Sequence, residues 1–483
     1  MKMKSVRALM SAMAMFGSAF AADTWYVDDD NFGKGGLDGT TPETAYGTIQ
    51  QAVDAAHAGD TILVLPGTYA QTTKESTGFV VKIENDPRYE NLTIRSTGGR
   101  DVTTIVGRPA TGDDSHGDSC LGGLYCGYTS AGAAIVDGFT FSNCYSRATA
   151  FKGRGSACLG YSGKIGALHV YNCRVVNSAG MPFYGVTVHS TIVDGATPAN
   201  DPENGSVFGQ VNADNCLITR ARGEAIAHNA RLVNCTLVGN SAHMKNGATT
   251  GVYAFNNSVL SLTPDCTGGY YPTTNSVSSG SLAYGKSANV YSNVASTNIF
   301  ACVNGFADYR LRSDSVAVGL ADGAALTTQV PLVPADRDPQ DEPGRYSTYH
   351  DVYGNAIDVT RPFNAGAIQE TVAVDDSAVA VTWFKQAYKE PLVIDGETFI
   401  GAEAFVRTAS ASPMQWCVTT AEPETKPLSA VQDSLANLYR MAGSNGTVWV
   451  TSAPVGQTRV LSVETAQKIF YMDPEGNDAW DGL

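Results

Sequence analysis

The chain has 483 residues, of which only 16% are charged and 50 are glycine, and its formal net charge is −15. This acidic balance argues against nucleic acid as a partner, because phosphate binding needs clustered Lys and Arg. It also disfavours electrostatic docking on an anionic membrane. The length fits two to four domains, or one long solenoid with an accessory domain, and the composition favours short strands joined by turns.

The first 21 residues have the pattern of a secretory signal peptide. Lys2, Lys4 and Arg7 precede an apolar run over residues 8–16, and Ala19 and Ala21 mark a cleavage site. The run is too short to span a bilayer, and the rest of the sequence contains no transmembrane candidate. We therefore expect a secreted protein, either extracellular or on the cell surface.

Residues 22–69 predict the capped start of a stack of strands. Aromatic residues on a short strand are followed by acidic, glycine-rich turns up to Gly39. Thr48 and Gln51 then form a capping-box pattern that opens a short helix ending near His57. A β-rich run over residues 61–65 follows. One short amphipathic helix before many strands is typical of a cap over the open end of a solenoid.

A repeated strand–Asn–Cys pattern occupies the centre of the chain. An apolar strand is followed by Asn and then by Cys or Ser at five places: Asn143-Cys144, Asn172-Cys173, Asn215-Cys216, Asn234-Cys235 and Asn257-Ser258. Residues 186–190 supply a degenerate sixth copy, if Ser190 takes the Cys position. The average spacing of about 23 residues predicts one turn of a parallel β-solenoid per repeat.

Stacked coils place equivalent side chains above one another, about 4.8 Å apart. The repeated Asn residues should then form a ladder of amide hydrogen bonds, as stacked Asn residues do in cross-β assemblies. The Cys residues should form a neighbouring column of small buried side chains. We interpret both columns as structural.

The repeat register offers one group of candidate catalytic residues. Two sets of positions, eight and ten residues after each Cys, would share an outer face and contain mostly charged side chains: Lys152, Arg154, Glu224, His243 and Lys245, with Arg222 beside them. This face would either bind an acidic sugar or simply be solvated. His57, His169 and His350 form no recognisable constellation in the sequence.

Calcium and disulfides are the other chemical features that the sequence suggests. Asp113, Asp114 and Asp118 concentrate carboxylates in a Gly-rich loop, a set of hard oxygen ligands that could hold Ca²⁺, although no cofactor is required. Exposed acidic loops without an ion are the alternative. Cys120 with Cys126, and Cys266 with Cys302, are plausible disulfides outside the Cys column.

The C-terminal part has a different character. Residues 371–465 predict a small β-rich accessory domain or spacer, with strands over 379–384 and 447–451 and one helix over 428–441. Residues 466–483 repeat the aromatic, acidic and Asp-Gly features of residues 24–39. This similarity predicts the start of a second, truncated β-helix repeat.

Residues 24–69, together with 309–315, 351–355 and 365–370, resemble secreted right-handed parallel β-helix proteins of the pectin-lyase-like superfamily. The resemblance covers roughly residues 24–370, and it implies that residues 22–370 form an all-β, right-handed parallel β-helix with a short N-terminal capping helix. It also implies a carbohydrate partner, a polysaccharide or a cell-surface glycan. Proteins of this kind include polysaccharide lyases, glycoside hydrolases and large surface proteins without a known reaction.

Two classes of function therefore stay open. Pectate-lyase-like enzymes use a calcium-binding carboxylate cluster with an Arg base, and polygalacturonase-like hydrolases use several Asp residues with a His. The sequence lacks their Asn-Thr-Asp, Gly-His-Gly and Arg-Ile-Lys motifs. This favours a glycan-binding or adhesive scaffold, with a polysaccharide lyase or glycoside hydrolase as the alternative.

Overall fold

The computed structural model describes most of the region between residues 22 and 372 and a set of strands beyond it. The described residues are 22–70, 78–111, 117–127, 133–147, 154–160, 165–197, 207–219, 221, 227–228, 230–238, 240, 254–256, 259–260, 273–278, 289–291, 294, 299–300, 309–372, 379–394, 397–408, 414–419, 430–432, 436–440, 446–454 and 459–465. The predicted signal peptide and residues 466–483 lie outside them.

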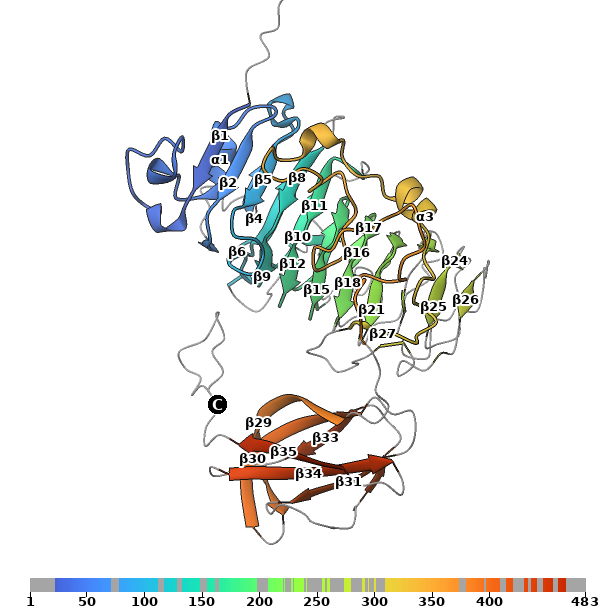
Figure 1. The fold of residues 1–483 in the computed structure, drawn as a ribbon. Coiled ribbons are helices and arrows are strands. Elements are labelled where there is room, and N and C mark those ends of the chain that lie inside the picture. The colour runs from blue at the N-terminus through green and yellow to red at the C-terminus, as the bar shows by residue number, and fades with distance from the viewer. Residues whose placement is uncertain are drawn as a thin grey trace, which may run out of the picture.

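Three parallel sheets run along the axis of a β-helix (Figure 1). The first sheet has ten strands: β1 (Thr24–Val27), β2 (Thr61–Val64), β5 (Thr93–Ser96), β8 (Ala134–Asp137), β11 (Leu168–Tyr171), β14 (Thr187–His189), β17 (Asn212–Asp214), β20 (Arg231–Val233), β22 (Ala254–Asn256) and β24 (Thr273–Thr274). Strands that are neighbours in this sheet come from successive coils, because each coil returns to the same sheet after visiting the other two. The predicted parallel β-helix is therefore confirmed.

The other two sheets complete each coil. The second sheet contains β3 (Gly67–Tyr69), β6 (Thr103–Val106), β9 (Thr140–Ser142), β12 (Arg174–Val176), β15 (Ile192–Asp194), β18 (Leu217–Thr219), β21 (Thr236–Val238), β23 (Val259–Leu260), β25 (Ser276–Ser278) and β26 (Val290–Tyr291). The third contains β4 (Phe79–Ile83), β7 (Gly122–Cys126), β10 (Arg154–Gly160), β13 (Met181–Tyr184), β16 (Phe208–Gly209) and β19 (Ala227–His228).

A short helix covers the N-terminal end, as predicted. Helix α1 spans Ile49–Ala55, and the Thr48 side chain caps it by accepting a hydrogen bond from the Gln51 amide. Its apolar residues Ile49, Ala52 and Val53 are buried against β1, β2 and β4. Asp60 closes this unit by accepting hydrogen bonds from the indole of Trp25 and from two backbone amides.

The Asn residues of the repeat lie at two different corners of the coil. Asn172, Asn215 and Asn234 turn the chain from the first sheet to the second, whereas Asn143 follows β9 and turns it from the second sheet to the third. Asn143, Asn172, Asn215 and Asn234 have φ angles of 51°, 49°, 51° and 54°, in the left-handed region that Asn tolerates better than most residues. The predicted amide ladder forms in part: Asn234 Nδ2 donates to Asn215 Oδ1 at 2.8 Å. By contrast, Asn172 donates to Asp137 and Asn215 to Asp214. Asn257 lies outside the described residues.

The Cys column is confirmed for Cys173, Cys216 and Cys235, with two corrections to its register. Cys144 is not part of it: Ser142 pairs with Val176, which places Cys144 level with Ser178, and Phe139 lies beside Cys173 instead. Cys144, Cys173, Cys216 and Cys235 are fully buried, and burial raises the pKa of the Cys173 thiol to about 12. Ser190 does not belong to this column. Pairing of Tyr171 with His189 places Ser190, with a φ of 49°, at the Asn position and puts the buried Thr191 beside Cys173. The degenerate repeat is thus displaced by one residue from the predicted alignment.

The expected disulfide between Cys120 and Cys126 is wrong. Both residues are buried thiols in the described part of the chain. Cys126 ends β7 and Cys120 precedes that strand by two residues. An extended stretch rises about 3.3 Å per residue, which separates the two far beyond the roughly 7 Å that a disulfide tolerates. Cys266 and Cys302 lie outside the described residues.

After the last coil the chain returns along the outside of the β-helix. Helix α3 (Gly323–Gln329) contacts β20, and the segment of residues 331–368, which we call the strap, then runs over the first sheet (Figure 1). Arg337, in a 3-10 turn over Ala335–Arg337, reaches back to Asn91 and Ala133. Near the other end of the strap, the Gly366 amide donates to the side chain of Asn234. A buried cluster of Ile135, Tyr171, Val333 and Tyr346 holds the strap on the sheet.

Where the structure describes residues between 371 and 465, they form strands of mixed length. β27 (Leu311–Arg312) pairs with β28 (Thr371–Val372), and antiparallel pairing joins β29 (Val379–Ile394), β30 (Glu397–Thr408), β31 (Met414–Thr419), β32 (Ala430–Gln432), β33 (Ala436–Arg440), β34 (Gly446–Pro454) and β35 (Arg459–Thr465). The predicted strands at 379–384 and 447–451 are confirmed. The helix predicted over 428–441 is wrong, because its described residues pair as strands β32 and β33. Across the described residues, the helices are all too short or too polar to cross a membrane.

Candidate functional site

Most of the site residues predicted from the repeat register lie outside the described residues: Lys152, Arg222, Glu224, His243 and Lys245. The described one is Arg154, at the start of β10. Its guanidinium lies 4.9 Å from the centre of the Tyr184 ring and donates to the Tyr184 hydroxyl. The proposed basic face therefore stays a prediction. Its one described member, Arg154, stacks on the Tyr184 ring.

The alignment behind that face is wrong where it can be followed. The prediction placed Arg154 level with Phe183, whereas Arg154 pairs with Met181 and a bulge then brings Cys158 level with Phe183. Met181 and Phe183 are both buried. Insertions between the second and third sheets differ in length from coil to coil, so counting from the Cys column does not carry the register across them.

The calcium prediction stays untested, because Asp113 and Asp114 lie outside the described residues and Asp118 is exposed in a turn. Within the described ranges, the three carboxylates close enough together to hold an ion are those of Asp28, Asp29 and Asp30. Two of them are already used by the backbone: Asp28 accepts from the Asp30 amide and Asp29 from the Thr68 amide. This cluster organises the turn after β1.

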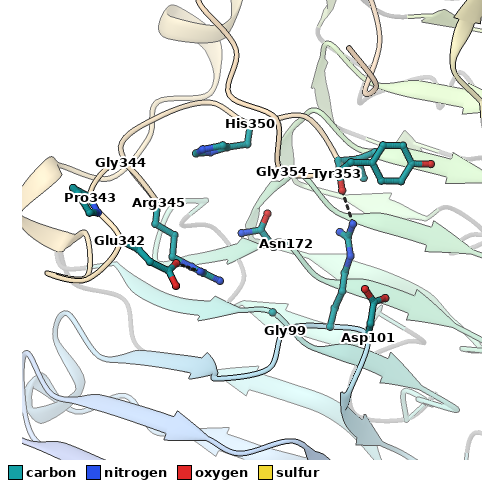
Figure 2. A pocket seen from close by; sticks show the side chains of 13 residues that line it. Gly99, Asp101, Asn172, Glu342, Pro343, Gly344, Arg345, His350, Tyr353 and Gly354 are labelled. Carbon is teal, nitrogen blue, oxygen red and sulfur yellow. Dashed lines mark hydrogen bonds and ion pairs between the residues drawn. The ribbon is translucent and has the colours of Figure 1, made fainter. Parts of the chain in front are cut away.

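A polar cleft of about 580 Å³ lies between the strap and the corners of the β-helix. Its floor is made by the loop at 99–101 and by the corner residues Gly138 and Asn172, and its roof by strap residues 342–354. Figure 2 shows Asn172 between Glu342 and Arg345 on one side and Asp101 and Tyr353 on the other. The cleft combines residues that are far apart in the sequence, and the repeat pattern alone does not reveal it.

Two arginines hold the walls of this cleft together. Arg100 donates to the carbonyl oxygens of Cys173 and Ser190 in the coils and of Val352 in the strap. Burial lowers the pKa of Arg100. Arg345 donates from Nε to the fully buried carboxylate of Asp137 at 2.5 Å, and it also pairs with Glu342. Both guanidinium groups are thus committed to positioning the strap.

The accessible groups of the cleft are two carboxylates, an imidazole and an aromatic ring. The side chains of Asp101 and Glu342 are 73% and 44% exposed, although they also pair with Arg174 and Arg345, respectively. Tyr353 is 49% exposed. His350 is partly buried, and this burial lowers its pKa, so the imidazole is neutral at neutral pH. These groups can accept hydrogen bonds from the hydroxyl groups of a ligand, and the Tyr353 ring can stack on an apolar face of that ligand.

The repeat pattern did not point to the cleft residues, and it did not point to a second, buried group of polar side chains. His169 was expected to belong to no constellation with His57 and His350, yet it is hydrogen-bonded to His189, and His189 to Asp214, on successive strands of the first sheet. The signal was present in the repeat: His169, His189 and Asp214 all occupy outward positions of strands whose alternate residues are buried. Only the corrected register brings them together.

Comparisons with known proteins identify no family for the chain. No family model matches the chain, and no curated protein matches its sequence. Two solved structures are similar, each with a TM-score of 0.32: a rhamnogalacturonan lyase, at 13% identity over 53% of this chain and 68% of that one, and pectate lyase Pel9A, at 15% identity over 73% and 98%. The assignment of a parallel β-helix to this chain depends on its own strand pairing.

Proposed function

We propose that this chain is an exported glycan-binding β-helix and that the cleft beneath strap residues 342–354 holds the glycan. The observation that carries the proposal is the exposed ring of Tyr353 at the edge of a cleft that is lined mainly by polar groups. Aromatic rings stack on the apolar C–H faces of sugars, while carboxylates and amides bind their hydroxyl groups. The cleft offers both kinds of contact.

The hydrogen bonds of Arg100 and Arg345 favour glycan binding over lyase chemistry at this cleft. Elimination on a uronate needs a cation that neutralises the substrate carboxylate in the transition state. Arg100 is occupied by three backbone carbonyl groups, and Arg345 by Asp137 and Glu342. Neither can turn to a substrate without releasing the strap. With Asp101 and Glu342 also present, a neutral or weakly charged glycan fits the site better than a polyuronate.

The rest of the chain suits a scaffold role. A long stack of coils presents its surface to an extended partner, and the signal-peptide pattern would deliver it to the cell exterior. The net charge of −15 is compatible with a glycan partner and argues against nucleic acid. We therefore place the protein outside the cell or on its surface, as a binding or adhesive module.

The test is glycan binding by the full-length mature chain, measured by calorimetry against neutral and acidic oligosaccharides. Tyr353→Ala should weaken binding of the best ligand about tenfold, the equivalent of about 1.4 kcal/mol of lost stacking. Tyr291→Ala is the matched control, because Tyr291 is similarly exposed, at 42%, on β26. Equal affinity for wild type and Tyr353→Ala would refute the site.

A second assay separates binding from catalysis. Lyase action on pectate or alginate creates an unsaturated uronate that absorbs ultraviolet light. We expect a flat trace with and without Ca²⁺. A rising absorbance that chelation abolishes would replace the binding proposal with a polysaccharide lyase.

A further inference from the structure

Three ionisable side chains form a continuous hydrogen-bonded row on the outer face of the first sheet, beneath the strap. His169 Nδ1 lies 2.9 Å from His189 Nε2, and His189 Nδ1 lies 2.5 Å from Asp214 Oδ2. They come from β11, β14 and β17, and all three are buried. The row follows from the coil register, since His189 lies between the strand of His169 and that of Asp214.

The carboxylate at one end sets the positions of the protons. An ionised Asp214 can only accept, so His189 Nδ1 carries the hydrogen that it receives. A neutral His189 is then an acceptor at Nε2, and His169 must donate from Nδ1. The nitrogen left with a free lone pair is His169 Nε2. A carboxylate orients the imidazole of a Ser-His-Asp triad by the same logic, here extended by one ring.

Packing keeps both rings in this orientation. The Tyr171 ring stacks on that of His189, with centroids 4.2 Å apart and an interplanar angle of 15°. The rings of His169 and His189 are themselves nearly parallel, at 12°. The Tyr171 hydroxyl is tied to the strap through the carbonyl oxygen of Tyr346. A flip of either imidazole would break the hydrogen bonds of the row.

The outer end of the row opens into a second cavity, of about 440 Å³. His169 lines it together with Glu90, Leu332, Asp336 and Arg337. Within the described ranges, His169 Nε2 has no hydrogen-bond partner, although the residue is only 7% exposed. A lone pair on an otherwise buried imidazole is therefore presented to a cavity large enough for a sugar unit.

We infer that His169 is a general base for the hydrolysis of esters on neutral sugars, with His189 and Asp214 as positioning residues. Water would add to the ester carbonyl carbon while His169 Nε2 takes a proton from the water. The Nδ1 proton of His169 would pass to His189, leaving the positive charge beside Asp214. When the C–O bond breaks, the proton returns to the leaving alcohol, and the products are an acid and a free hydroxyl.

The charges around the cavity suit this chemistry and select the ligand. Burial, the neighbouring His189 and the positive charge of Arg337 lower the pKa of His169, so the base is neutral at neutral pH. The Arg337 guanidinium donates to Asn91, Ala133 and Thr93, so it gives the cavity a fixed positive charge and not a free hydrogen-bond donor. The charged and titratable groups around His169 are His189, Asp214, Tyr171, Glu90, Asp336 and Arg337. The acidic excess disfavours uronates, hence the preference for neutral sugars.

The inference goes beyond glycan binding and is tested separately from it. The full chain is incubated with p-nitrophenyl acetate, and acetate release from O-acetylated neutral oligosaccharides is measured in parallel. We expect ester hydrolysis above the buffer rate, with a pH profile that levels off above a midpoint below 6.5. His169→Gln should return the rate to that of buffer. His57→Gln, at an exposed histidine beside α1, should leave it unchanged.

Two further measurements keep the result interpretable if a variant fails to fold. Asp214→Asn should lower the plateau and shift the pH profile, an effect that loss of packing alone would not produce. Nitrogen-15 NMR of histidine in the wild-type chain should show His169 unprotonated at Nε2 and protonated at Nδ1 near pH 7. A protonated Nε2, or hydrolysis no faster than in buffer, would overturn the inference whatever the cleft at Tyr353 binds.

Discussion

Asp137→Asn is the sharpest test of how the strap is held. The Asp137 carboxylate is fully buried and accepts from Arg345 Nε at 2.5 Å, from the Tyr346 hydroxyl at 2.9 Å and from Asn172 at 3.2 Å. The substitution keeps the shape of the side chain and removes its charge. It leaves the Arg345 guanidinium, whose side chain is 21% exposed, without its buried counter-ion.

Removing one member of a buried ion pair costs roughly 3–5 kcal/mol. Arg345 keeps Glu342 and some contact with water, so we expect about 3 kcal/mol, at the low end of that range. At about 1.4 kcal/mol per factor of ten, this corresponds to strap opening that is more frequent by roughly two orders of magnitude. The cost falls on the strap, because the coils beneath it keep their own strand pairing.

Native-state hydrogen exchange measures this opening directly. Exchange at the Val352 and Ile357 amides, which are bonded within the strap region, should accelerate about a hundredfold in Asp137→Asn. Asp341→Asn is the matched control, because Asp341 makes only a 3.7 Å surface pair with Arg95 and should change stability by less than about 1 kcal/mol. Equal exchange in the two variants would refute the view that the buried pair anchors the strap.

Two further predictions concern the corners and the response to pH. In urea unfolding, Asn234→Ala should destabilise the chain by about 1 kcal/mol more than Asn234→Gly. Both variants lose the side-chain hydrogen bonds to Asn215 and Gly366, but only Ala is strained at a φ of 54°. Equal losses of stability in the two variants would contradict this. Burial lowers the pKa of His350 and of His169 below the unfolded value of about 6.5, so the unfolded chain binds more protons between those values. Stability should therefore be complete above about pH 6.5 and decline on acidification towards pH 5. Thermal unfolding at several pH values checks this, and His350→Gln should reduce the decline.

The fold was largely predictable because each coil of a solenoid repeats a similar sequence pattern. The Asn corner, the buried Cys column and the capping helix each depend on contacts within one coil or between neighbouring coils, so local patterns report them. The one-residue error at Ser190 arose because Ser190 and Thr191 are both small and polar, and either could stand in for Cys. The helix expected over 428–441 failed because strand pairing overrode the helix propensity of its Leu and Ala residues.

The candidate sites were much less predictable, for a geometric reason. Both cavities are roofed by the strap, whose residues contact coils that precede them by 100 residues or more, as Arg345 does with Asp137 and Arg337 with Asn91. No periodicity relates those positions. The row of His169, His189 and Asp214 was easier to predict, because it requires only the correct register of three neighbouring strands.

The strap also limits how this architecture can evolve. Solenoids usually gain and lose coils easily, because each coil contacts only its neighbours. Here one continuous segment contacts Asn91 near the start of the stack, Ser190 in its middle and Asn234 further along. An extra coil between these points would displace the later ones by about 4.8 Å and put every following contact out of step. The strap therefore fixes the number of coils between its contact points, and coil duplication can lengthen the stack only outside the region that the strap contacts.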